Sequence, residues 1–259
     1  MKILLTAAMV AAIFSFELAS PACHASDANE QSNTPQPVLE KEMSLKQQLE
    51  ALAAQSKSKK TDESKAVMQN ALDALEKSGI VEQVLKDGAR TPDFALPNAV
   101  GKTITLKQLL SKGPVVVTFY RGGWCPYCNL ALRALEKSLP AITAQNASLV
   151  AISPQQPDAT LSTVEKDKLS FEVLSDSGNT VARQFGLVYQ LPPDLIKIYK
   201  GFGIDLERVN GNKSDELPLS ATFIIDSDGT IAYVYVDTDY KKRMEPSDIV
   251  AELKRIKSK

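Results

Sequence analysis

The sequence predicts an α/β protein, with a mixed central sheet, helices on both faces and a helical segment before it. Three observations carry this expectation. Strand-like and helix-like segments alternate from residue 89 onward, and the alternation ends in a hairpin followed by a helix. The composition, 44% hydrophobic and 24% charged residues, is that of a soluble globular protein. With 259 residues, the chain holds one domain of ordinary size plus appendages.

The first 25 residues have the pattern of an export signal. A lysine follows the initiating methionine, residues 3–16 form an apolar run that is short for a bilayer span, and small residues precede a cleavage point after Ala25. A single membrane anchor and a lipid-modified Cys23 are the alternatives, and both fit less well. We therefore expect an exported, periplasmic protein. Its mature chain would keep Cys125 and Cys128 as its only cysteines and would have no histidine.

Residues 26–40 are polar and contain prolines, as in a flexible linker, and residues 41–88 form an N-terminal segment with helical apolar spacing. Within that segment, residues 56–60 (Ser-Lys-Ser-Lys-Lys) interrupt the pattern. They form either a basic patch or, as the simpler interpretation, a solvated loop between two helices. These helices could pack on the main domain, pair with another subunit or cover the active site, and the sequence does not choose between these arrangements.

Residues 89–259 form the main domain. β-Branched and apolar runs bounded by glycine or proline predict strands, and apolar residues at three- and four-residue spacing predict helices. In chain order the expected strands are residues 93–96, 103–106, 114–120, 148–152, 171–174, 221–225 and 230–236, and the expected helices are residues 107–110, 125–139, 160–169, 179–185, 191–202 and 246–256.

The turn between the last two strands contains Asp226, Asp228 and Gly229. Two carboxylates before a glycine occur in calcium-binding loops, but the remaining ligand positions of such a loop are absent. We therefore expect a hairpin turn built on Asp-Gly.

The most informative segment is Gly-Gly-Trp-Cys-Pro-Tyr-Cys at residues 122–128, directly after the apolar strand of residues 114–120. This order predicts a strand, a tight turn and the N-terminus of a helix. We expect both sulfurs of Cys125 and Cys128 to be exposed at the positive end of that helix, where the unpaired N–H groups favour thiolate over thiol. A second thiol one helical turn away can convert the oxidised first cysteine to an internal disulfide.

Three simpler interpretations of the cysteine pair are weaker. A zinc site needs about two further ligands, and the mature chain supplies no other cysteine and no histidine. A structural disulfide that closes so small a ring stabilises little. Two buried thiols would not be expected at a Gly-Gly turn with a proline between them. Redox chemistry therefore explains the pair best.

Three neighbouring residues are further candidates for the site. Arg121 is either a solvated charge at the end of the strand or a group that lowers a thiol pKa and binds a peroxide oxygen. Trp124 is expected to shield the cysteine pair by packing. Tyr120 and Arg183 are interpreted as structural.

Several segments in a specific order resemble the peroxiredoxin-like branch of the thioredoxin-like superfamily, that is, the alkyl hydroperoxide reductases and thiol-specific antioxidant proteins. The resemblance covers roughly residues 88–253 and implies a thioredoxin-like fold. The segments that carry it are residues 90–97 (Arg-Thr-Pro-Asp-Phe-Ala-Leu-Pro), 119–128, 151–154 (Ala-Ile-Ser-Pro), 173–176 (Val-Leu-Ser-Asp), 185–187 (Phe-Gly-Leu), 221–226 (Ala-Thr-Phe-Ile-Ile-Asp) and 228–229 (Asp-Gly).

The chain departs from the pattern of that family at its activating residues. By the resemblance, Cys128 takes the place of the peroxide-attacking cysteine, Cys125 that of a threonine and Arg121 that of a proline. Ser220 stands where the family has an arginine, and Ala221 stands where thioredoxins have a cis-proline. Two of the family's peroxide-activating groups are therefore missing.

The resemblance implies a thiol-dependent peroxidase. The Cys128 thiolate would attack hydrogen peroxide or an organic hydroperoxide, Cys125 would resolve the product to a disulfide, and Arg121 would hold the peroxide in place of the missing arginine. A thioredoxin-like or other dithiol reductant would close the cycle. The main alternative is a thiol–disulfide oxidoreductase acting on exported proteins, with Cys125 as the nucleophile. A third hypothesis is a redox-sensing module in which the disulfide changes how the N-terminal helices dock.

The charge and the side chains available limit other partners. The formal net charge is −1, which gives no basis for binding nucleic acid or an anionic membrane. No cofactor or metal site is expected. After signal cleavage, no segment of the protein would remain inserted in a membrane. A homodimer is one arrangement that the sequence permits.

Overall fold

The computed structural model describes residues 43–258 of the chain. The expected export signal and the linker of residues 26–40 lie outside these residues and stay predictions. Within the described part, none of the helices combines the length and the apolar character needed to cross a bilayer.

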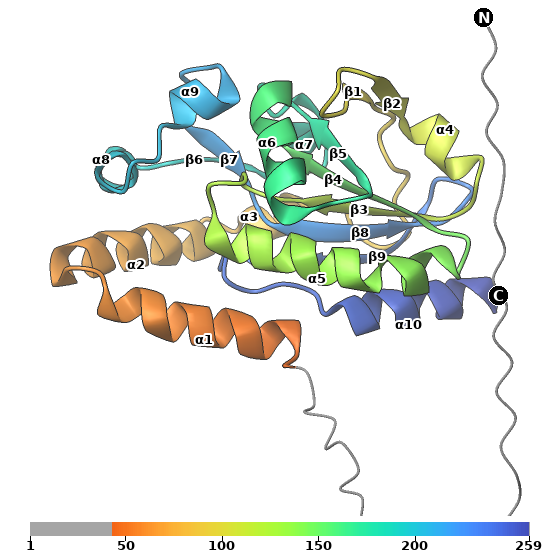
Figure 1. The fold of residues 1–259 in the computed structure, drawn as a ribbon, viewed down its shortest axis with the longest axis horizontal. Helices are drawn as coiled ribbons and strands as arrows, with labels where there is room; N and C mark the ends of the chain where they lie inside the picture. The colour runs from red at the N-terminus through yellow and green to blue at the C-terminus, as the bar shows by residue number, and fades with distance from the viewer. Residues whose placement is uncertain (1–42, 259) are drawn as a thin grey trace, which may run out of the picture. The chain divides into compact units, whose positions relative to one another are not determined.

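A five-stranded mixed sheet forms the centre of the domain, in the order β5-β4-β3-β8-β9 (Figure 1). Strand β3 (Val115–Phe119) pairs in parallel with β4 (Ser148–Ser153), which pairs in parallel with β5 (Glu172–Ser175). On its other side, β3 pairs antiparallel with β8 (Ala221–Ile225), and β8 pairs antiparallel with β9 (Ile231–Val236). All five residues of β3 are buried because the strand is central and covered on both faces, which explains its unbroken apolar sequence.

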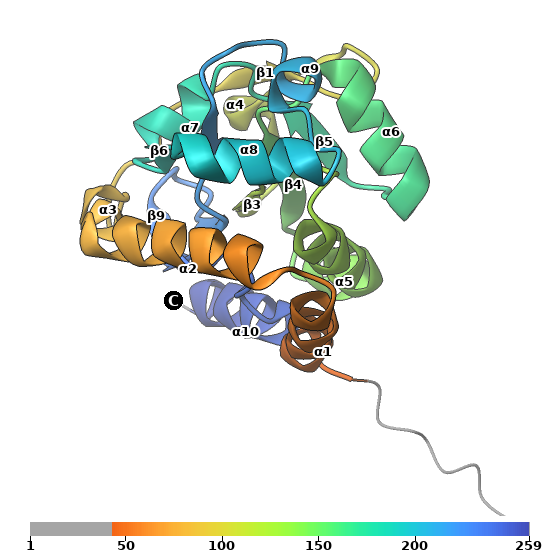
Figure 2. The same cartoon turned by 90° about the vertical axis from the view of Figure 1, so that its left-hand side faces the viewer.

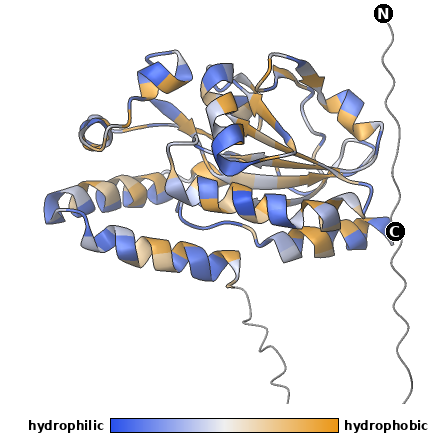
Figure 3. Ribbon diagram, viewed as in Figure 1, coloured by the Kyte–Doolittle hydropathy of each residue, from blue (hydrophilic) through white to orange (hydrophobic). Residues whose placement is uncertain are grey.

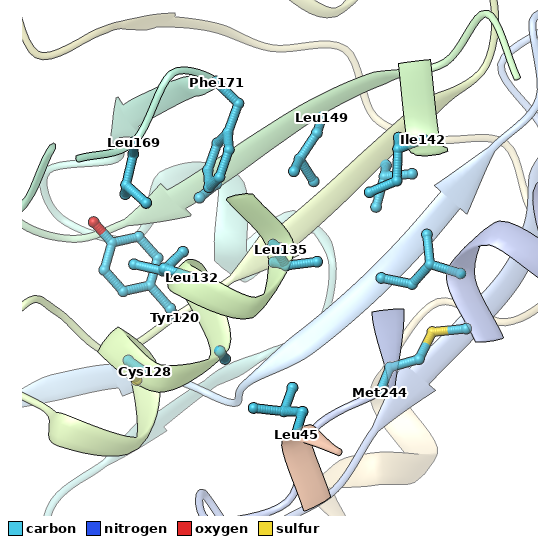
Figure 4. Packing of buried hydrophobic residues seen from close by; sticks show 14 of the residues in the cluster. Leu45, Tyr120, Cys128, Leu132, Leu135, Ile142, Leu149, Leu169, Phe171 and Met244 are labelled. Carbon is cyan, nitrogen blue, oxygen red and sulfur yellow. The ribbon is translucent and has the colours of Figure 1, made fainter. Parts of the chain in front are cut away.

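One face of the sheet is covered by α5 (Pro126–Thr143), α10 (Pro246–Lys257) and, outside them, α1 (Leu45–Ser58) (Figure 1). Their buried side chains form one continuous cluster with the sheet, as Figure 4 shows around Leu132 and Leu135 of α5. Leu45 of α1 and Cys128 of α5 belong to this same cluster. The first N-terminal helix is therefore part of the core of the main domain.

The opposite face packs against short elements: α3 (Ile80–Gln83), α4 (Leu106–Leu110), α7 (Thr180–Gln184) and the antiparallel pair β1 (Ala95–Pro97) and β2 (Thr103–Thr105). A mixed sheet with helices on both faces is thus confirmed. Helix α6 (Pro157–Asp167) follows β4 and contributes Val164 to the cluster on the α5 face.

A third, smaller cluster joins helix α2 (Asp62–Lys77) to α8 (Pro193–Gly201), α9 (Leu206–Asn210) and the antiparallel pair of β6 (Val188–Gln190) and β7 (Glu216–Pro218). Figure 2 shows α2 alongside α8. The sequence analysis did not predict β6, β7 or α9. Hydrophobic and hydrophilic residues alternate along α1, α2 and α10, as expected of helices that cover a core on one side (Figure 3).

Candidate active site

The chain turns sharply between β3 and α5, and two glycines make the turn. Gly122 has φ +144°, and a Cβ added there would lie 2.4 Å from the indole Nε1 of Trp124. A Cβ on Gly123 would lie 2.1 Å from Oγ1 of Thr163 in α6. Cys125 is the N-cap residue of α5 and Pro126 begins the helix, so both cysteines stand within its first turn.

Both cysteines are buried: Cys125 is 1% exposed and Cys128 0% exposed, and both are free thiols. The expectation of exposed sulfurs is therefore wrong. The sequence predicted the helix terminus correctly, but side chains from α1, α2, α8 and the segment after β9 cover it. A cavity of about 320 Å³ remains beside the pair; Cys125 lies in its wall, and Cys128 does not.

The Cys128 sulfur has a cationic partner that the sequence did not predict. Arg243, between β9 and α10, donates a hydrogen bond from Nη2 to Cys128 Sγ at 3.2 Å. Burial opposes ionisation of Cys128, but the hydrogen bond from Cys125 and the charges of Arg243 and Arg121 together hold its pKa well below the usual value. Burial, together with the hydrogen bond to Cys128, raises the pKa of the Cys125 thiol well above its usual value. The surroundings therefore favour the thiolate form of Cys128 and the protonated form of Cys125.

Arg121 is 2% exposed, so its interpretation as a solvated charge at the strand end is wrong. Its guanidinium carbon lies 4.9 Å from the ring centre of Trp124, 5.5 Å from that of Tyr199 and 4.2 Å from that of Tyr240. It donates hydrogen bonds to the Tyr199 hydroxyl and, at 4.0 Å, to Cys125 Sγ, while its Nε has no partner. No carboxylate of residues 43–258 forms an ion pair with it. Aromatic rings thus stabilise this buried cation in place of an anion.

The other residues singled out in the sequence have structural surroundings. Trp124 is partly buried and packs on Tyr199, with ring centres 5.6 Å apart. Tyr120 lies in the core cluster (Figure 4), and Arg183 forms a 2.8 Å ion pair with Glu216. Ser220 is buried and its hydroxyl has no hydrogen-bond partner.

The Asp-Gly turn between β8 and β9 has the expected hairpin structure. Asp228 accepts a hydrogen bond from the Thr230 backbone N–H at 2.8 Å, and Asp226 pairs with Thr230 through the backbone. Within residues 43–258, no group of three histidine, cysteine or acidic side chains is arranged to hold a metal ion.

Sequence reasoning missed Arg243 as well as the aromatic rings of Tyr199 and Tyr240. All three are distant from the cysteine motif in the chain, and no local pattern marks them. The sequence marked residues 56–60 as basic, but it did not predict where they lie in the fold. In the structure, Lys59 and Lys60 line the same cavity as Cys125.

Comparison with known proteins gives a consistent result. The model of the AhpC/TSA family matches residues 88–234. Chloroplastic peroxiredoxin Q of Sedum lineare is 30% identical over 161 residues, which cover 62% of this chain and 74% of that protein. Its counterpart in Triticum aestivum is 29% identical over 158 residues, which cover 61% of this chain and 62% of that protein. The match thus spans about two thirds of the length of these relatives.

A solved structure agrees with these sequence matches. Peroxidoxin BcpB from Mycobacterium tuberculosis aligns with a TM-score of 0.53 and 26% identity, over 66% of this chain and 97% of that one. The family match contains the cysteine pair and the sheet except for the last two residues of β9, whereas α1, α2 and α3 lie before it.

Proposed function

Since the chain belongs to the AhpC/TSA family, the peroxiredoxins of the thioredoxin-like superfamily, we propose that its cysteine pair is the centre of a thiol-dependent peroxidase. The observation that supports this most directly is the contact of 3.2 Å between Arg243 Nη2 and Cys128 Sγ. A guanidinium beside a cysteine in the first turn of a helix stabilises the thiolate, which is the form that attacks a peroxide. Arg243 thereby supplies a charge that this chain lacks at Ser220, the position where the family pattern has an arginine.

The reaction proceeds in two steps. Cys128 thiolate attacks the terminal oxygen of the hydroperoxide; the S–O bond forms, the O–O bond breaks, and the leaving alkoxide or hydroxide takes up a proton. Cys125 then attacks the sulfenic sulfur of Cys128, so that the disulfide forms and water leaves with the Cys125 proton. In sum, one hydroperoxide is reduced to an alcohol or water, and two thiols are oxidised to a disulfide. An external thiol or dithiol reductant restores the pair.

The alternative function, disulfide exchange with exported proteins, would make Cys125 the attacking thiolate. Its raised pKa argues against that role, because a protonated thiol is a poor nucleophile. Its burial argues against it too, since a protein disulfide could not reach the sulfur without movement of the covering side chains.

Rapid mixing of the reduced protein with hydrogen peroxide tests the proposal, with Trp124 fluorescence and the thiol count as readouts. We expect fast loss of both thiols in the wild type, no fast phase in Cys128→Ser, and a single stoichiometric oxidation of Cys128 in Cys125→Ser. Full turnover by Cys128→Ser would refute the assignment. Oxidation of the wild type no faster than that of a free thiol would show that this chain shares only the family's fold.

We also propose that the protein is exported to the periplasm and that residues 1–25 are removed. N-terminal sequencing of the protein recovered from its native cells tests this. Ser26 as the first residue would support export with cleavage, and an intact Met1 would contradict it.

A further inference from the structure

We propose that the cavity beside Cys125 binds a small anionic thiol, and that this thiol reduces the disulfide by attacking Cys125. The inference builds on the proposed function, because it supplies the reducing half of the same cycle. It concerns the space beside Cys125 and two lysines that line it, Lys59 and Lys60, which have no role in the reaction with peroxide.

The positive charge of the side chains that line the cavity favours the binding of an anion. Arg121 lies in its wall, is buried, has a free Nε and has no carboxylate partner among the described residues. Lys59 and Lys60 from the end of α1 line the same cavity, and neither forms an ion pair within residues 43–258. Lys60 Nζ is held by the Ser56 carbonyl at 3.3 Å. Three cations and no carboxylate therefore surround this space.

The walls and size of the cavity suit a small molecule with an apolar body. Met68, Phe202 and Ile204 contribute aliphatic and aromatic surface, and the rings of Trp124 and Tyr240 complete it. A volume of about 320 Å³ is at the lower end of the range for small-molecule sites. A folded protein reductant is far larger than this space, whereas a thiol of a few carbon atoms bearing carboxylates fits the charge and the size.

The position of the two sulfurs sets the direction of attack. Cys125 lies in the cavity wall and Cys128 does not, so a thiolate in the cavity meets the Cys125 sulfur first. That attack forms a bond from the incoming sulfur to Cys125 and breaks the bond to Cys128, which leaves as the thiolate beside Arg243. A sulfur with a low thiol pKa leaves faster in such an exchange. A second small thiol then attacks the mixed disulfide. Overall, two small thiols are oxidised to their disulfide, and the protein disulfide takes up two electrons and two protons.

The test begins with protein oxidised by diamide, so that no peroxide reaction is needed. Three small thiols serve as reductants: mercaptosuccinate (anionic), 2-mercaptoethanol (neutral) and cysteamine (cationic). Alkylation and mass spectrometry measure how fast each one reduces the disulfide. The rates are compared at equal thiolate concentration and normalised to the reaction of each thiol with 2-hydroxyethyl disulfide. We expect mercaptosuccinate to be about 10-fold faster than 2-mercaptoethanol at low salt, and the ratio to fall as salt is added. Cysteamine should be the slowest.

The lysines are tested with matched variants. Lys59→Gln/Lys60→Gln should bring the ratio of the anionic to the neutral thiol close to unity. Lys57→Gln removes a charge from the same helix end but not from this cavity, so it should retain the wild-type ratio. In the first turnover, the mixed disulfide should form on Cys125.

Equal normalised rates for anionic and neutral thiols, an unchanged ratio in the double variant, or a mixed disulfide on Cys128 would each overturn the proposal. Because the disulfide is made with diamide, a protein inert to peroxide would refute the proposed function without affecting this result.

Discussion

At the scale of single residues, the two cysteines differ because of their neighbours. Cys128 has the Arg243 guanidinium in contact and a thiol that donates to it. Cys125 accepts only a long hydrogen bond, 4.0 Å from Arg121 Nη1, and the charges of Arg121 and Arg243 do not offset its burial. Two residues three positions apart on one helix therefore acquire opposite pKa shifts. In the proposed reaction, this difference suits Cys128 to the role of nucleophile and Cys125 to that of the proton-bearing resolving thiol.

Replacing Arg243 by Gln should raise the Cys128 pKa and slow peroxide oxidation at pH 6 by about 10-fold or more, since a nearby opposite charge shifts a pKa by about 1–3 units. Thiolate absorbance at 240 nm against pH measures the pKa, and rapid mixing measures the rate. Lys242→Gln is the control, because Lys242 forms an ion pair with Asp237 rather than with the sulfur. An unaltered pKa in Arg243→Gln would contradict the role given to Arg243.

The same pKa shift should appear in the stability of the reduced protein. The folded Cys128 pKa is depressed below the unfolded value of about 8.5, so its contribution is present above that pH and is lost as the pH falls through the folded pKa. The Tm of the wild type relative to Cys128→Ser should therefore rise from pH 5 to pH 8.5. Above about pH 8.5 the raised Cys125 pKa acts in the opposite direction, because ionisation then favours the unfolded chain. A Tm difference independent of pH would show that folding does not lower the pKa of Cys128.

At the scale of elements, the turn between β3 and α5 depends on close packing against α6. Gly123 allows the chain to pass Thr163, whose hydroxyl donates to the Ala159 carbonyl at 3.0 Å. The Gly123 N–H donates to Gln155 Oε1 at 2.6 Å, and its carbonyl accepts from Asn129 and Lys166. These contacts from both sides hold the motif in one geometry.

Gly123→Ala should destabilise the protein by about 1–3 kcal/mol, because the new methyl group would overlap Thr163, whose β-branched side chain is fixed and buried. Urea unfolding gives the change in the free energy of unfolding. Gly201→Ala is the matched control: no atom lies within 4 Å of the added Cβ, and in helix α8 the substitution should be neutral or stabilising by about 0.5–1 kcal/mol. Equal effects of the two substitutions would be inconsistent with this packing argument.

At the scale of the whole molecule, α1 and α2 are bound to the sheet domain by buried apolar side chains. Leu45 and Leu49 belong to the cluster of α5 and α10, and Val67 and Met68 pack with α8. Glu245, the N-cap residue of α10, accepts hydrogen bonds from the backbone N–H groups of Leu45 and Lys46. Of the three arrangements left open by the sequence, packing on the main domain is the one observed, and it also covers the cysteine pair.

Leu49→Ala should therefore destabilise the entire domain by about 2–4 kcal/mol, the usual effect of truncating a buried leucine. Circular dichroism and Trp124 fluorescence should report one common urea midpoint, because α1 shares its core with the sheet. Glu50→Ala, on the exposed side of α1, should change the midpoint little. Separate transitions for helix content and fluorescence would indicate that the N-terminal helices unfold independently.

The sequence by itself determined the class of fold and the long elements, and it predicted redox chemistry for the cysteine pair. Apolar periodicity specifies strands and helices locally, and Gly-Gly followed by Cys-Pro specifies a strand, turn and helix start. The tertiary structure alone decided which charge contacts Cys128, because Arg243 approaches across 115 positions of the chain. It also decided that both sulfurs are buried and that Ser56, Lys59 and Lys60 line a cavity. Burial and electrostatic contacts depend on which distant segments pack together, and no local pattern encodes that packing.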